Sequence, residues 1–197
     1  MGMDGRGNSF MRYRVLIERI EAGNGPIGRT RLECTLQASL SRVFNRLKLT
    51  GWVDEEIDFA NSKPGHGARI SLNGTFRPTD HLELVLNSDY RFLDVMGGQR
   101  LFTAQVERLK ATYTFSPRSF LRLIGQHART DRDPDLYTFP VPAHDGSLSA
   151  SALYAYKLNW QTVFYAGYGD EKALTDQREY EPGARSLFAK LSYAFQH

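Results

Sequence analysis

In the stretch Thr30–Leu40, TRLECTLQASL, polar and apolar residues alternate without exception from Arg31 onwards. Its apolar positions are Leu32, Cys34, Leu36, Ala38 and Leu40. A helix would distribute such a set around its whole circumference, whereas a strand places it on one face. The sequence therefore predicts a β-strand with one apolar and one polar face.

The same alternation recurs along the chain, in 68–76, 81–92 and 187–195. Less regular segments extend the pattern to about ten strands, because runs of this kind separated by turn residues are typical of antiparallel sheets. The predicted strands lie near 11–22, 29–40, 43–56, 66–77, 80–93, 99–115, 119–130, 147–157, 160–170 and 184–196.

The connections between these strands are predicted to differ in length at the two ends. Short polar turns are expected at 41–42, 77–80, 116–119 and 157–159. Longer loops rich in Gly, Pro and Asp are expected at 23–28, 57–65, 94–98, 131–146 and 171–183. Pro and Asp favour turns through a fixed φ and through side-chain hydrogen bonds to the backbone. Short turns at one end and long loops at the other are typical of outer-membrane β-barrels.

Composition narrows the class of protein further. Mean hydropathy is −0.44, and no apolar run approaches the roughly 18 residues that a membrane-spanning helix needs. The low mean hydropathy does not exclude a membrane β-barrel, because barrel strands place only every second residue in lipid. The formal charge of +3 on 197 residues is small and dispersed, so it does not indicate a nucleic-acid partner. The single cysteine, Cys34, excludes an intrachain disulfide, and its apolar position predicts a small hydrophobic role.

Together these patterns predict an all-β, antiparallel up-and-down transmembrane β-barrel of about ten strands, complete in itself or part of a larger barrel. We expect the alternating polar residues to face a wet lumen and the apolar residues to face lipid. The predicted lipid-facing residues are Leu32, Leu36, Leu40, Ile70, Leu72, Leu187 and Leu191. Aromatic residues prefer the membrane–water interface, and the predicted girdle is Phe76, Phe115, Tyr156, Trp160 and Phe195.

In the predicted strand 99–115, the apolar residues do not all lie on the same face. Leu109, Ala111, Tyr113 and Phe115 share a parity, whereas Phe102, Ala104 and Val106 hold the other. The pattern predicts either a β-bulge near Glu107 and Arg108 or a strand whose outer half projects beyond the bilayer.

Three segments, 156–163 (YKLNWQTV), 167–170 (GYGD) and 191–196 (LSYAFQ), resemble a bacterial family. It is the C-terminal barrel of large, mostly uncharacterised outer-membrane proteins with a family-9 carbohydrate-binding-like domain upstream. Further matching stretches are 76–82, 100–105 and 113–117, and the resemblance spans roughly residues 30–196. It implies an outer-membrane location and brings no catalytic residues.

The resemblance and the N-terminal sequence predict the domain organisation. Residues 1–8, MGMDGRGN, contain neither an apolar core nor a cleavage site of an export signal. We therefore expect residues 1–10 to be a disordered or incomplete segment, and 11–197 to be the C-terminal portion of a barrel from a longer protein. Tyr193 and Phe195 resemble the terminal aromatics that barrel-insertion machinery recognises, so that machinery and outer-membrane lipids are the expected partners.

Candidate catalytic residues are few. His144-Asp145 with Ser147, and His127 near Asp131, are the acid–His groups that an enzyme at a barrel rim would use. Adjacent loop residues of this kind are more often simply solvated, so we expect no catalytic residue.

Binding motifs are equally sparse. Gly167–Asp170 is Gly-rich, but no helix follows to form a phosphate site. The acidic run Asp54-Glu55-Glu56 with Asp58 has oxygens suited to a divalent cation, although a solvated acidic rim is the expected arrangement. We expect no metal site and no cofactor.

Three functional classes remain in competition: a membrane-embedded pore, transporter or anchor without catalytic activity; a soluble β-barrel that binds an apolar ligand; and an enzyme at the rim of an outer-membrane barrel. The lumen residues Arg31, Glu33 and Lys190 give a mixed charge, which favours a wet or plugged interior over an apolar cavity. We expect the first class, with an unknown solute.

Overall fold

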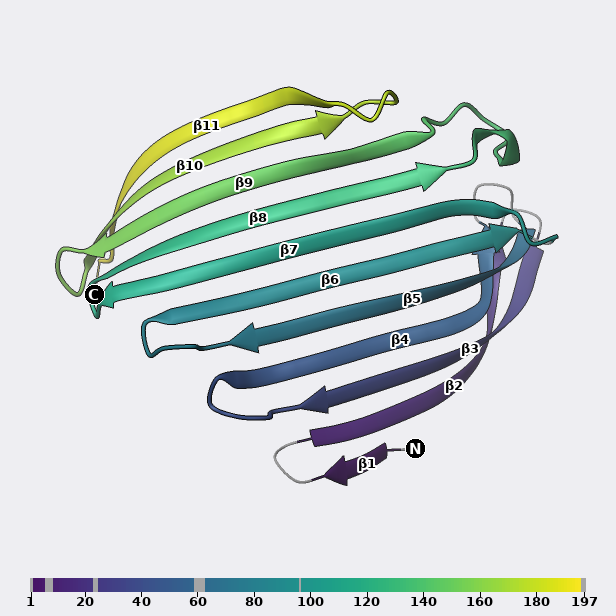
Figure 1. Cartoon of the computed structure of the whole chain (residues 1–197), viewed down its shortest axis with the longest axis horizontal. Coiled ribbons are helices and arrows are strands. Elements are labelled where there is room, and N and C mark those ends of the chain that lie inside the picture. The colour runs from purple at the N-terminus through teal and green to yellow at the C-terminus, as the bar shows by residue number, and fades with distance from the viewer. Residues whose placement is uncertain (1, 6–8, 23–24, 59–62, 96, 196–197) are drawn as a thin grey trace.

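A computed structural model describes residues 2–5, 9–22, 25–58, 63–95 and 97–195. The described chain forms one antiparallel sheet in which eleven strands follow in sequence order (Figure 1). A single 3-10 turn, η1 (Pro134–Leu136), is the helical element of the described residues. The strands are β1 (Gly2–Gly5), β2 (Ser9–Ala22), β3 (Gly25–Ala38), β4 (Phe44–Asp58), β5 (Lys63–Phe76), β6 (Leu82–Val95), β7 (Arg100–Ser116), β8 (Ser119–Arg132), β9 (His144–Lys157), β10 (Thr162–Leu174) and β11 (Tyr180–Tyr193).

The prediction of an all-β, antiparallel, up-and-down fold is confirmed. The ten predicted strands correspond to β2 through β11. The structure adds β1, a short strand that pairs with the beginning of β2, from Gly2 opposite Arg12 to Gly5 opposite Ser9. No helix in the described part of the chain is long and apolar enough to cross a membrane.

The predicted difference in loop length is mostly wrong. Connections 39–43, 77–81, 117–118 and 158–161 form one end of the sheet, at the left in Figure 1 and here called the short-turn end. At the opposite end, here called the loop end, only 133–143 exceeds five residues. Strands continue through polar and Gly-rich sequence because backbone pairing requires extended backbone and not apolar side chains.

The pairing register gives the sheet two chemically distinct faces. Paired residues share a face, and successive residues alternate between faces. The apolar face carries Val15, Leu32, Val53, Ile70, Leu86, Leu109, Leu123, Ala152, Tyr168 and Leu187. The polar face carries Arg14, Glu33, Trp52, Arg69, Arg91, Lys110, Arg122, Ser151 and Lys190.

The sheet curls towards its polar face. Gly67 of β5 lies between Glu56 of β4 and Leu93 of β6, although β4 and β6 are not neighbours. A Cβ atom at Gly67 would lie 3.3 Å from Glu56 Cβ and 3.6 Å from Leu93 Cδ1. The two flanking strands therefore converge over β5, and a glycine permits this close approach. The polar face is the concave side at this bend.

On the apolar face, the apolar residues end before the strands do. In β7 they run from Phe115 to Leu109, and Glu107 and Gln105 follow on the same face. Pairing between β6 and β7 is uninterrupted from Leu82 opposite Tyr113 to Leu93 opposite Phe102. A bulge at Glu107 and Arg108 is thus excluded, and the phase change lies in the side chains alone. The strand continues past the apolar band.

Fully buried side chains are few and lie mainly at the loop end. Ile57, Leu93 and Leu101 are 1–2% exposed, at the ends of β4, β6 and β7. Large side chains on the apolar face are exposed instead, with Ile17 and Leu187 both 83% accessible. On the polar face, Asp54, Glu56, Leu93 and Ala155 are 2–9% exposed, so away from the strand ends burial favours the polar side, the reverse of the usual arrangement in a soluble protein.

Candidate functional site

A network of ion pairs covers the polar face at the loop end of β3, β4 and β6. Glu56 accepts hydrogen bonds from Arg29 and Arg31, both at 3.2 Å, and from Arg91 at 3.1 Å. Arg31 also donates to Asp54 at 3.1 Å. The side chains of Asp54 and Glu56 are 0% and 3% exposed. Buried carboxylates need such compensation, because an unpaired buried charge is very unfavourable.

Trp52 packs against two arginines of this network. The Arg31 guanidinium lies 4.3 Å from the Trp52 ring centroid, and that of Arg91 lies 5.7 Å away. Arg91 is also 5.5 Å from the Phe102 ring. Such contacts favour a cation on an aromatic face. Glu18 also accepts from Arg29 at 2.7 Å, so the network holds three guanidinium groups against three carboxylates and is close to neutral.

The opposite half of the polar face is chemically different. On β9, β10 and β11 it presents small residues, among them Ser149, Ser151, Gly169 and Ser186. A hollow of about 360 Å³ lies over them, and Arg108 of β7 also lines it. Bulky paired charges on one side and small hydroxyl-bearing residues on the other leave space along β9–β11.

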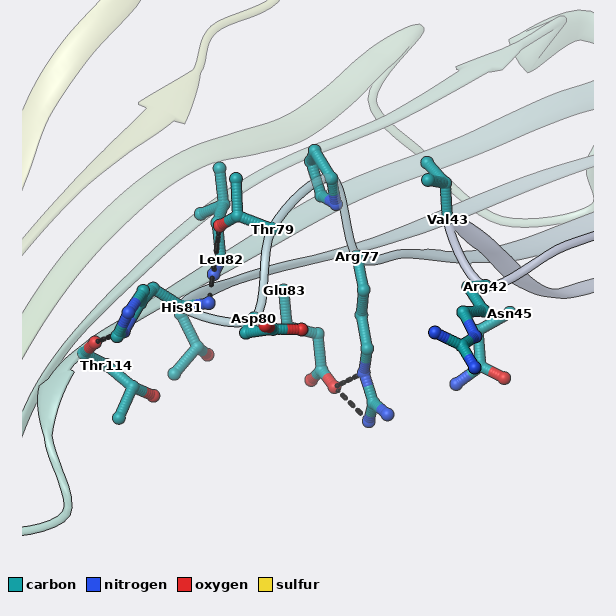
Figure 2. A pocket seen from close by; sticks show the side chains of 12 residues that line it. Arg42, Val43, Asn45, Arg77, Thr79, Asp80, His81, Leu82, Glu83 and Thr114 are labelled. Carbon is teal, nitrogen blue, oxygen red and sulfur yellow. Dashed lines mark hydrogen bonds and ion pairs between the residues drawn. The ribbon is translucent and has the colours of Figure 1, made fainter.

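A hollow of about 790 Å³ lies at the short-turn end between connections 39–43 and 77–81 (Figure 2). Arg77 donates to Glu83 at 2.7 Å, and His81 Nδ1 lies 2.7 Å from the Thr114 carbonyl oxygen. Thr79 Oγ1 accepts from the backbone N–H of Leu82, which fixes the turn. In Figure 2 these groups satisfy one another and do not converge on a common point. The hollow is a groove between turns.

The predicted acid–His pairs form differently in the structure. His144 Nδ1 lies 2.6 Å from Asp131 Oδ1 on the neighbouring strand, whereas Asp145 pairs with Arg132 at 3.5 Å. Ser147 shares a face with Asp145 and not with His144, because it is three residues from His144 in an alternating strand. No Ser–His pair results from this set.

Other residues surround this rim group. Arg178 Nε donates to His144 Nε2 at 3.2 Å. His127 Nε2 lies 2.7 Å from the Tyr180 hydroxyl instead of approaching Asp131, which stands four residues further along β8. These contacts join the loop ends of β8, β9 and β11 and serve as structural links.

The 133–143 connection lies back against the sheet. Asp133 N donates to the Leu101 carbonyl at 3.1 Å, and Tyr137 lies in a hollow shared with Asp58 and Pro64. Burial raises the pKa of the Tyr137 phenol above its ordinary value, although Arg132 opposes the shift. Tyr137 therefore anchors the connection to the loop ends of β4 and β5.

The acidic run in β4 was predicted as a solvated rim, and this prediction is wrong. Asp54 and Glu56 are buried on the polar face and paired with arginines. The usable signal was parity, because Asp54 and Glu56 alternate with Val53 as Arg29 and Arg31 alternate with Leu32. Pairing β3 with β4 by their apolar residues would have placed these charges together.

The remaining predicted residues lie as follows. Leu32, Leu36, Ile70, Leu72, Leu187 and Leu191 share the apolar face, and Leu40 is 65% exposed in connection 39–43. Phe76, Phe115, Tyr156, Trp160 and Phe195 all lie at the short-turn end, where Phe76 contacts Phe44 and Phe115 contacts Tyr113 edge to face. Tyr193 and Phe195 have ring centroids 4.8 Å apart. Contact of any of them with lipid stays a prediction.

Among the described residues, no group of three or more His, Cys, Asp or Glu is arranged to hold a metal ion. Comparisons of the chain with protein-family models, curated proteins and solved structures found no match. The site must therefore be interpreted from its own chemistry.

Proposed function

We propose that this chain is a transmembrane β-barrel of the bacterial outer membrane, acting as a pore, transporter or anchor without catalytic activity. The observation that carries the proposal is the inverted burial of the two faces. Side chains such as Val15, Val53 and Leu187 are 56–83% exposed on the apolar face. On the polar face, Arg29 and Arg31 are only 13–17% exposed.

A soluble protein is a poor fit to this arrangement. Exposed apolar patches on soluble monomers rarely exceed a few hundred Å², yet the apolar face extends across every strand from β2 to β11. Outer-membrane barrels have this distribution, with an apolar exterior and a polar interior. Outer-membrane lipids are accordingly the proposed partner of the apolar face.

Closure into a barrel is part of the proposal. The sheet has open edges at β1, at β2 beyond Arg12 and at β11 in the described residues (Figure 1), and unpaired backbone groups are very unfavourable in lipid. β2 and β11 run in opposite directions, so they can join as an antiparallel pair. Pairing of these two strands would give a barrel of ten strands, whereas β1 runs parallel to β11.

The stagger of the sheet supports this closure. A row of directly paired residues starts at Phe10, at the short-turn end of β2, and reaches Glu171 of β10 opposite 183–184 of β11. On β11 the row therefore lies about ten residues from Tyr193, which is at the short-turn end, whereas on β2 it starts at that end. For strands ~4.8 Å apart, this offset corresponds to a tilt of the strands of about 35–40° from the barrel axis. Barrels have tilts in this range. The row is Phe10, Gln37, Lys48, Asn73, Asn87, Arg108, Gln126, Ser149 and Glu171.

Closure can be tested by cross-linking at the rim. Aligning the apolar bands of β2 and β11 brings Arg19 near Arg185, beyond the band. In a Cys34→Ser background, Arg19→Cys with Arg185→Cys should form a disulfide within one chain in liposomes. Arg19→Cys with Asp131→Cys is the control that should not cross-link. A disulfide between two chains would instead indicate a barrel assembled from several copies.

The membrane proposal itself is tested by folding. The chain should refold only with detergent or lipid, and should then migrate differently on a gel before and after heating, as closed barrels do. A folded monomer in plain buffer would contradict the proposal and favour a soluble β-protein. The resemblance to barrels that follow a carbohydrate-binding-like domain, and recognition of Tyr193 and Phe195 by insertion machinery, belong to the same proposal.

A further inference from the structure

We propose that the lumen of this barrel prefers anions, which pass along the polar face of β7–β11. This inference rests on the proposed barrel and adds the class of solute. It starts from charges on the polar face that have no counter-charge. Arg108, Arg122, Lys190 and Lys48 have no carboxylate within ion-pair distance among the described residues.

The carboxylates of the polar face, in contrast, are mostly neutralised. Glu33 pairs with Arg14 at 3.0 Å, Asp89 with Arg69 at 2.6 Å, and Glu83 with both Arg77 and Lys110. Asp54 and Glu56 are held by three arginines. Apart from Glu171, the fixed charge that remains free to act on a solute is therefore positive.

The free positive charge is concentrated on one side. Between the row of Arg108 and the short-turn end, the polar face of β7–β11 contains Lys110, Arg122 and Lys190 and no carboxylate in the described residues. Glu171 lies in the same row of paired residues as Arg108, at the boundary of this sector, and Asp145, which pairs with Arg132, lies nearer the loop end. An anion that enters from the loop end passes Asp145 and Glu171 and then encounters cations only.

The same side has the space and the donors that an anion requires. The hollow of about 360 Å³ is lined by the donors Arg108, Gln126, Ser149, Ser151 and Ser186. Asp170 and Glu171 also line it, and Asp170 pairs with Arg185 at 3.3 Å. A guanidinium, an amide and three hydroxyls can all donate hydrogen bonds to an anion. The Arg122 Nε atom is buried without a hydrogen-bond partner. A path lined by one sign of charge concentrates ions of the opposite sign.

The test is the reversal potential of the purified chain in a planar lipid bilayer under a KCl gradient. We expect chloride to be favoured over potassium by up to about tenfold. Arg108→Glu with Arg122→Glu should move the ratio to unity or below, and Arg108→Gln alone should move it part of the way. Arg19→Glu with Arg185→Glu makes the same change in charge on the apolar face and should leave selectivity unchanged.

Each outcome has a separate meaning when the sample is checked for heat-modifiable migration. A folded barrel that carries no current, or that favours potassium, overturns the inference while the membrane barrel stands. Equal shifts in the lumen pair and the control pair would also overturn it, because selectivity would then come from surface charge. Failure of the chain to fold in lipid would remove the proposed barrel and this inference with it.

Discussion

Replacing Leu191 by arginine tests whether the apolar face contacts lipid or water. Leu191 lies on the apolar face of β11, opposite Phe164 of β10, and is 64% exposed. Ser192, the next residue, lies on the polar face opposite Val163. Leu191→Arg and Ser192→Arg therefore place the same charge at the same height on the two sides of one strand.

The magnitude follows from exposure and depth. The accessible part of Leu191 is roughly 100 Å² of mainly apolar surface, which contributes about 2.5 kcal/mol at ~25 cal/mol per Å² when it leaves water. A guanidinium adds about 2 kcal/mol at a position between the midplane and the interface. Leu191→Arg should thus lower the free energy of unfolding by about 4 kcal/mol. Ser192→Arg, which faces the wet interior, should lower it by less than about 1 kcal/mol.

Reversible urea unfolding in liposomes, followed by tryptophan fluorescence, measures both values. A soluble sheet predicts another result, because arginine on an exposed surface in water usually changes stability by less than about 0.5 kcal/mol. Equal effects of the two substitutions would refute the assignment of the apolar face to lipid.

Three further results are expected. Glu56→Gln leaves three arginines without their shared carboxylate and should lower the free energy of unfolding by about 3–5 kcal/mol in the same urea titration. Glu33→Gln is the control: its partner Arg14 is 60% exposed, so the free energy of unfolding should change by about 1 kcal/mol or less. Protease added to intact cells should cut within 131–146 and spare 77–80, and Tyr137→Ala should accelerate the cut; cleavage at 77–80 would reverse the proposed topology. The raised pKa of Tyr137 means that docking of this connection is complete below the ordinary phenol pKa of about 10 and is lost as pH rises above it, so an alkali-stable protease should cut faster there in the parent chain but not in Tyr137→Phe.

Alternation in the sequence predicted the strands well, because an apolar set at period two is compatible with one backbone geometry only. It also predicted which leucines share a face. The short strand Gly2–Gly5 lacks alternation and was not predicted. The strands were predicted too short at the loop end, where polar and Gly-rich residues continue the ladder, as in 63–65, so the loops were predicted to be longer than they are.

The ion-pair network on the polar face could not be predicted from local sequence patterns. Arg29 and Arg91 lie 27 and 35 residues from Glu56 along the chain, and only the strand register brings them together. His144 shows the same limit, because its partner Asp131 is thirteen residues away and the adjacent Asp145 faces elsewhere. Local sequence gives the composition of a face, whereas partners across strands depend on pairing that is set over the whole sheet.

The strict sequence order of the strands has a consequence for how such a protein changes in size. Each strand pairs with the strands that precede and follow it, so each hairpin is a local unit of low contact order. Deleting or duplicating one hairpin preserves the antiparallel direction at both new junctions. The circumference of the sheet can therefore grow or shrink by two strands at a time, which makes whole hairpins the natural unit for engineering a wider or narrower variant.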